Sequence, residues 1–115
     1  MSESVIDQNI YAELQSTAGA EFAAELVDTF LEEAPGMLAE LRSACAQGDA
    51  ESFRRAAHSL KSNGNTFGAV KLAAMARELE LAGLNPDPAH DLDALSALDA
   101  EYARAVAALK ELCSG

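Results

Sequence analysis

The chain has 115 residues, a length that accommodates one domain with its own core. Half of the residues are apolar, only 5% are aromatic, and the many Ala and Leu residues favour helices. Nineteen acidic residues against eight basic ones give a formal net charge of -11, which argues against nucleic acid or an anionic membrane as a partner. There is no apolar run long enough to cross a bilayer and no secretion signal after Met1, so we expect a cytoplasmic protein.

Apolar residues recur at helical spacing along almost the whole chain, and no strand is predicted. A short helix is expected over residues 7–16, before a break at residues 17–19. A long helix follows from Ala20, and its apolar stripe contains Phe22, Leu26, Phe30, Leu31, Met37, Leu38, Leu41 and Cys45. Pro35 and Gly36 interrupt this stripe, so the segment is either one helix bent at Pro35, which we favour, or two helices.

Three more helices are predicted after Gly48. Asp49 can cap a helix over residues 50–67, whose buried face is Phe53, Ala57, Leu60, Gly64 and Phe67. A helix over 69–84 follows, and the Pro- and Gly-containing loop over 83–88 separates it from a final helix over 89–113. The apolar stripe of that helix is Leu92, Leu95, Leu98, Tyr102, Val106, Leu109 and Leu112.

Amphipathic helices joined by short connections pack antiparallel to their neighbours. We therefore predict an all-α protein with a single domain over 1–115. A short N-terminal helix with its lead-in occupies 1–18, and an antiparallel up-down four-helix bundle occupies 19–113. Such a bundle buries its own core, so we expect a monomer. The two cysteines do not form a disulfide framework; Cys45 is expected in the core and Cys113 exposed.

Motifs for nucleotide or metal binding are missing from the sequence. The seven glycines form neither a dinucleotide-binding turn nor a phosphate-binding loop. Di-iron bundles need Glu-x-x-His pairs, but the residues three before His58 and His90 are Arg55 and Asp87. No Cys/His cluster has zinc spacing. We predict that the chain has no nucleotide or metal cofactor of its own, and that His90 is a plain surface residue.

Residues 52–77 contain no Asp or Glu, yet they hold five of the eight cationic residues, with His58 at the centre. On the predicted helix His58 is about 100° from the buried Ala57. Its neighbours three, four and seven residues away are Arg54, Arg55, Lys61, Ser62 and Asn65, all of them polar. We expect an exposed imidazole among groups suited to an anion. Neutral imidazole is a nucleophile that can take up a phosphoryl group, although a surface histidine without a role is the simpler alternative.

The run AAHSLKSNGNTFGA, residues 56–69, resembles the signature of histidine-containing phosphotransfer (HPt) domains. That signature has an Ala-rich approach, His-x-Leu-Lys, small residues and a Gly ten positions after the His, which is Gly68 here. The resemblance extends over residues 22–112. Further residues that resemble the family's neighbouring helices are Phe30, Pro35, Leu41, Leu72, Leu79 and Glu80.

The resemblance implies that His58 is phosphorylated on Nε2, that Lys61 offsets the charge of the phosphoryl group, and that Glu80 accepts a hydrogen bond from Nδ1–H and orients the ring. The surface expected to bind a partner contains Arg54, Arg55, Ser62, Asn65 and Gly68. The family commonly has Gly directly after the Lys. This chain has Ser62-Asn63 there, so we expect its partner preference to differ.

The implied partners are receiver domains of response regulators and a hybrid sensor kinase, and the Mg²⁺ used in transfer would be supplied by the receiver. The chain would be a carrier, not an enzyme, that shuttles a phosphoryl group between receiver aspartates in multi-step two-component signalling. One alternative is an HPt-like adaptor that binds a receiver or kinase without being phosphorylated. Others are an acidic adaptor that uses its outer face over 21–33, and a metal-dependent bundle enzyme.

Overall fold

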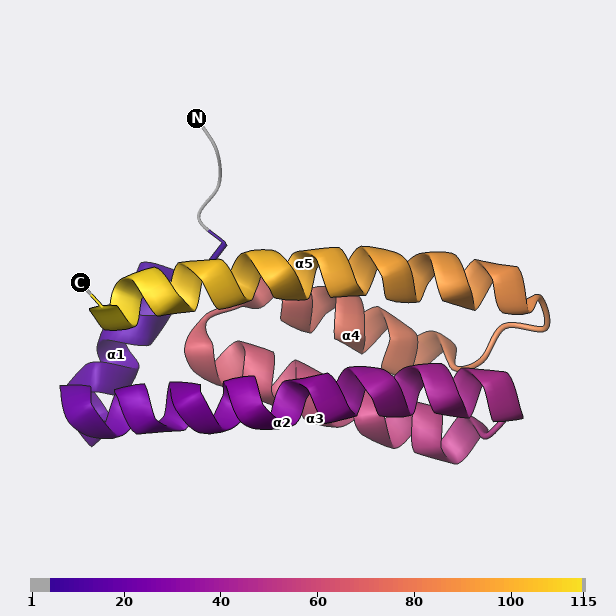
Figure 1. Cartoon of the computed structure of the whole chain (residues 1–115), viewed down its shortest axis with the longest axis horizontal. Coiled ribbons are helices and arrows are strands. Elements are labelled where there is room, and N and C mark those ends of the chain that lie inside the picture. Colours follow the sequence, from indigo (N-terminus) through magenta and orange to yellow (C-terminus); the bar gives the residue numbers. More distant parts are fainter. Residues whose placement is uncertain (1–4, 115) are drawn as a thin grey trace.

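The computed structural model describes residues 5–114, with the backbone alone at 88, 113 and 114, so the side chain of Cys113 lies outside the described part. The described residues form five α-helices and no strand: α1 (Gln8–Ala18), α2 (Ala20–Gln47), α3 (Ala50–Phe67), α4 (Val70–Ala82) and α5 (Pro88–Ser114). The helices α2 and α5 run in opposite directions along the bundle, and α1 packs across one end (Figure 1). The predicted all-α fold is confirmed. Within residues 5–114, no helix has both the length and the hydropathy of a membrane span.

Short connections with defined caps join the first four helices. Gly19 alone separates α1 from α2, and Gly48 with Asp49 separates α2 from α3. Gly48 ends α2 in the left-handed conformation, with φ of 70°. Asp49 begins α3, because its carboxylate accepts a hydrogen bond from the Ser52 backbone N–H at 3.1 Å. The two-residue connection between α2 and α3 makes α3 turn back along α2, whereas α1 lies across the end of the bundle (Figure 1).

The helix α2 is continuous through Pro35, which agrees with the favoured one-helix interpretation. Proline has no N–H to donate to the carbonyl of Leu31, one turn earlier. Pro35 and Gly36 are exposed, so water can hydrate that carbonyl and the helix need not break. The expected apolar stripe was wrong at Phe22, which is about half exposed, because the first turns of α2 bury Ala23 and Val27.

The start of α5 also differs from the prediction. Leu92 was expected on the buried stripe but is about half exposed, whereas Asp91 is buried. The Asp91 carboxylate accepts a hydrogen bond from the backbone N–H of Asn85 at 2.8 Å. This bond holds the loop before α5 against the helix, and the next residue, Leu92, faces solvent.

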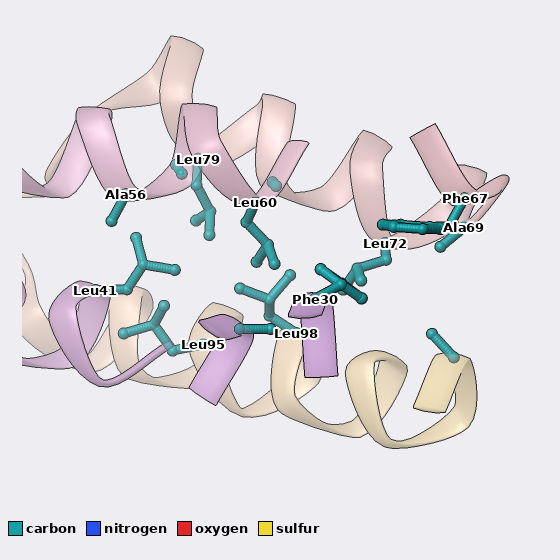
Figure 2. Packing of buried hydrophobic residues seen from close by; sticks show 14 of the residues in the cluster. Phe30, Leu41, Ala56, Leu60, Phe67, Ala69, Leu72, Leu79, Leu95 and Leu98 are labelled. Atoms are coloured by element: carbon teal, nitrogen blue, oxygen red, sulfur yellow. The ribbon is translucent and has the colours of Figure 1, made fainter. Parts of the chain in front are cut away.

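The core is one continuous cluster of apolar side chains between the four long helices. Figure 2 shows leucines from α2, α3, α4 and α5 converging in the middle of the bundle, among them Leu41, Leu60, Leu79 and Leu95. The α1 end is closed by Tyr11, which is buried and belongs to the same cluster. The Phe30 ring packs against that of Phe67, with centroids 5.2 Å apart.

Two glycines allow α3 to lie close to its neighbours. A Cβ atom at Gly64 would lie 3.2 Å from the Cβ of Ala73 on α4. Gly68, at the end of α3, has φ of +81°, and its carbonyl accepts a hydrogen bond from the Asp7 backbone N–H at 2.7 Å. A Cβ at Gly68 would lie only 2.7 Å from the Asp7 carbonyl oxygen. The segment that leads into α1 therefore covers Gly68.

We expect Gly68→Ala to lower the free energy of unfolding by about 3 kcal/mol, because it adds a clash to a strained φ. Gly48→Ala is the matched control: its φ is also positive, but nothing lies within 4 Å of its Cβ. Strain alone predicts a loss of about 1 kcal/mol there. Urea denaturation measures the free energy of unfolding of both variants. Equal losses would show that the clash with the Asp7 carbonyl adds nothing to the effect of the positive φ.

Candidate functional site

His58 lies on the solvent-facing side of α3, near the middle of the helix. The buried face of α3 contains every residue predicted for it and also Ala56. The His58 side chain is 56% exposed. Because hydrogen-bonded helical turns continue on both sides, the imidazole is carried by a rigid element. Its exposure leaves it open to approach from solvent.

Glu80, on α4, joins His58 to Lys61. Its Oε2 atom lies 2.7 Å from His58 Nδ1, and its Oε1 atom lies 2.8 Å from Lys61 Nζ. The Glu80 side chain is 17% exposed, so the bridge is more sheltered than the imidazole itself. The three residues that the resemblance singled out are thus linked, because Glu80 contacts both of the others.

The charge of Glu80 decides which imidazole nitrogen carries the proton. The hydrogen bond from Lys61 lowers the pKa of the Glu80 carboxyl below its ordinary value; partial burial opposes this shift, and the hydrogen bond with His58 adds to it. An ionised carboxylate only accepts hydrogen bonds, so Nδ1 must be the donor. In the neutral ring Nε2 then has a free lone pair, and Nε2 is the nitrogen available as a nucleophile.

The close packing of α3 on α4 brings these residues together. Gly68 and Ala69 are the only residues between the two helices, so α4 returns directly along α3. Contact at Gly64 and Ala73 fixes the distance between the helices in the first turns of α4. The same register places Glu80, near the far end of α4, opposite His58.

A shallow hollow of about 310 Å³ lies beside the imidazole. It is lined by Glu51, Arg54, Arg55, His58 and Glu80. Arg55 pairs with Glu51 one turn earlier on α3, at 3.3 Å. Glu51 was not among the predicted site residues, although its place seven residues before His58 puts it on the same face of the helix.

The residues predicted to bind a partner divide into two groups. Arg54, Arg55, Ser62 and Asn65 are exposed on α3, on the face that carries His58. Gly68 is buried beneath Asp7 and cannot form part of an exposed surface, so this part of the prediction was wrong. At the unusual Ser62-Asn63 pair, the Asn63 amide donates a hydrogen bond to the Ser59 carbonyl at 2.8 Å and is turned back onto α3.

The other predicted features lie apart from this site. His90 is exposed in the first turn of α5 and does not line the hollow. Cys45 is partly buried against the core, and burial raises the pKa of its thiol, with the charge of Asp91 adding to the effect. Among the described residues, no three His, Cys, Asp or Glu side chains are grouped so as to hold a metal ion.

An exposed histidine, bonded to a carboxylate on the next helix of a four-helix bundle, is the arrangement expected of a histidine phosphotransfer protein. The Hpt domain family matches residues 25–108, and the chain belongs to this family. A solved structure with the same fold is histidine-containing phosphotransfer protein B (HptB) from Pseudomonas aeruginosa PAO1. The two are 26% identical with a TM-score of 0.85, over 98% of this chain and 97% of the other. A comparison with curated proteins gives no match.

The depressed pKa of Glu80 can be tested by substitution of its partner. We expect Lys61→Met to raise the pKa of the Glu80 carboxyl, because the hydrogen bond from Lys61 is the largest cause of the shift. Lys71→Met, on the exposed face of α4, is the control and should leave the pKa of the Glu80 carboxyl unchanged. A ¹³C NMR titration of the carboxyl carbon measures this, and an unmoved titration in Lys61→Met would contradict the assignment.

The same shift has a consequence for folding. The pKa of the Glu80 carboxyl is lower in the folded chain than in the unfolded chain, so the ionised carboxylate stabilises the fold at pH values above its unfolded pKa. This stabilisation is lost as the pH falls through the pKa of the folded chain. The difference in stability between the native chain and Glu80→Gln should therefore shrink in acid.

Proposed function

We propose that this chain is a phosphorelay carrier, which accepts a phosphoryl group on His58 Nε2 from one receiver-domain aspartate and donates it to another. The observation that carries the proposal is the 2.7 Å contact between His58 Nδ1 and Glu80, since in the neutral ring it assigns the proton to Nδ1 and leaves the Nε2 lone pair available. Membership of the Hpt domain family supports the same role.

The transfer step follows from this arrangement. The Nε2 lone pair forms a bond to phosphorus as the P–O bond to the aspartate breaks, and the electron pair of that bond leaves on the aspartate carboxylate. No proton has to move: the ring becomes positively charged and keeps its Nδ1 proton, which faces the Glu80 carboxylate. Transfer to a second receiver reverses these changes. The receiver would supply Mg²⁺ and most of the catalysis, so the chain is proposed as a carrier and not as an enzyme.

Lys61 has two parts in this proposal. It lies one helical turn after His58 on α3, and one of its three N–H donors is directed at Glu80 Oε1, 2.8 Å away. Two donors are left for the oxygens of an incoming phosphoryl group. The same ammonium thus keeps Glu80 ionised and offsets the negative charge that arrives with the phosphate.

Transfer from a panel of radiolabelled, phosphorylated receiver domains with Mg²⁺ tests the proposal. We expect the chain to acquire an acid-labile, alkali-stable label, and His58→Gln to abolish it. His90→Gln is the matched control and should be labelled normally. Label on His58→Gln would overturn the assignment of the phosphoacceptor. Receivers that bind the native chain without labelling it would instead identify an adaptor.

Glu80 is proposed to act through the imidazole. In Glu80→Gln the side-chain amide can donate to Nδ1 and favour the tautomer whose Nε2 is protonated. We expect phosphotransfer to slow about tenfold, as for other groups that orient a functional histidine. Glu78→Gln, an exposed change on the same helix, should leave the rate unchanged. Rapid-quench kinetics measure both, and equal rates would remove Glu80 from the mechanism.

A further inference from the structure

A second hollow continues from the one beside His58. Its volume is about 400 Å³, and it lies between the start of α3 and the end of α4. Glu51, Arg54 and Glu80 line both hollows, so the two form one surface. The hollow extends towards Gly83, away from Ser62 and Asn65.

The added part of this surface is apolar. Leu81 lines it and is 69% exposed, the largest exposed fraction among the large apolar side chains of the described residues. The other lining residues contributed by this part are Ala50, Ala82 and Gly83, which are small and leave room for an incoming side chain. Single exposed leucines are common on protein surfaces, but this one adjoins Glu80 and borders a hollow that leads to the phosphoacceptor.

The charges on the combined surface are not balanced. Glu80 is paired with Lys61 and His58, and Glu51 is paired with Arg55. Arg54, which lines both hollows, forms no ion pair among the side chains that the structure describes. A guanidinium in this position suits a carboxylate supplied by a partner.

We propose that Leu81 and Arg54 form a specificity site, which binds an apolar side chain and a neighbouring carboxylate on the receiver domain. The inference rests on the proposed function and extends its docking surface towards the end of α4. Continuity with the hollow beside His58 and the unpaired charge of Arg54 identify the occupant as the receiver that exchanges the phosphoryl group. Leu81 lines only the second hollow, so it sets affinity for the receiver and takes no part in the chemistry.

Steady-state transfer from a phosphorylated receiver separates binding from chemistry. We expect Leu81→Ala to raise KM for the receiver about tenfold, as for a buried apolar contact in an interface, with kcat unchanged. The matched control is Leu92→Ala, another exposed leucine, on α5, which lines neither hollow. It should leave both constants unchanged. Both side chains are exposed, so the variants are expected to fold, and circular dichroism verifies this.

The contribution of Arg54 can be recognised from the dependence of KM on salt concentration. Arg54→Ala should raise KM and weaken its dependence on salt concentration, because a screened charge pair is removed. Lys71→Ala, an exposed cation outside both hollows, should change neither.

An unchanged KM in Leu81→Ala, or a loss confined to kcat, would overturn the specificity site while the transfer activity of the native chain still stands. Failure of the native chain to accept label from any receiver would instead count against the proposed function.

Discussion

The bridge made by the Glu80 carboxylate is the interaction on which the site depends. One of its oxygens contacts the His58 ring and the other contacts the Lys61 ammonium, so a single side chain links a partly sheltered cation to an exposed imidazole. Without Lys61 the carboxylate would lose the main cause of its lowered pKa. Without Glu80 nothing among the described contacts would select the Nδ1 tautomer of the imidazole. The tautomer of the His58 imidazole therefore depends on two side-chain contacts, His58–Glu80 and Glu80–Lys61.

The bundle makes this bridge possible by fixing the position of one helix against another. Glu80 is far from His58 along the chain, and the two meet only because α4 returns along α3 after two residues and packs closely at Gly64. The rest of the core holds this pair of helices from the other side, through leucines of α2 and α5 (Figure 2). An arrangement built on helices in this way has little freedom to drift from the required geometry.

Much of this could be predicted from the sequence because it depends on local spacing. Helical periodicity predicted the five helices and the buried face of α3, and the polar neighbours of His58 on that helix predicted its exposure. Contacts between distant segments were not predictable in this way. Gly68 was placed on an exposed surface because nothing near it in sequence reveals that Asp7 covers it. Phe22 and Leu92 were assigned to the core, but in each case a neighbouring residue, Ala23 or Asp91, is buried instead. Only the packing of the helices determines which of the two faces the core. The link between Lys61 and Glu80 required the register of α4 on α3.

The exposure of His58 has a second consequence. A ring that is 56% open to its surroundings can be reached by a large partner, but water reaches it as readily. The phosphorus–nitrogen bond is acid-labile, so under acidic conditions a phosphoryl group carried there would have a limited lifetime unless another protein covers it. Under the proposed function, a signal that finds no acceptor in time would disappear. The exposure of this helix face would then both admit a partner and limit how long an untransferred phosphoryl group persists.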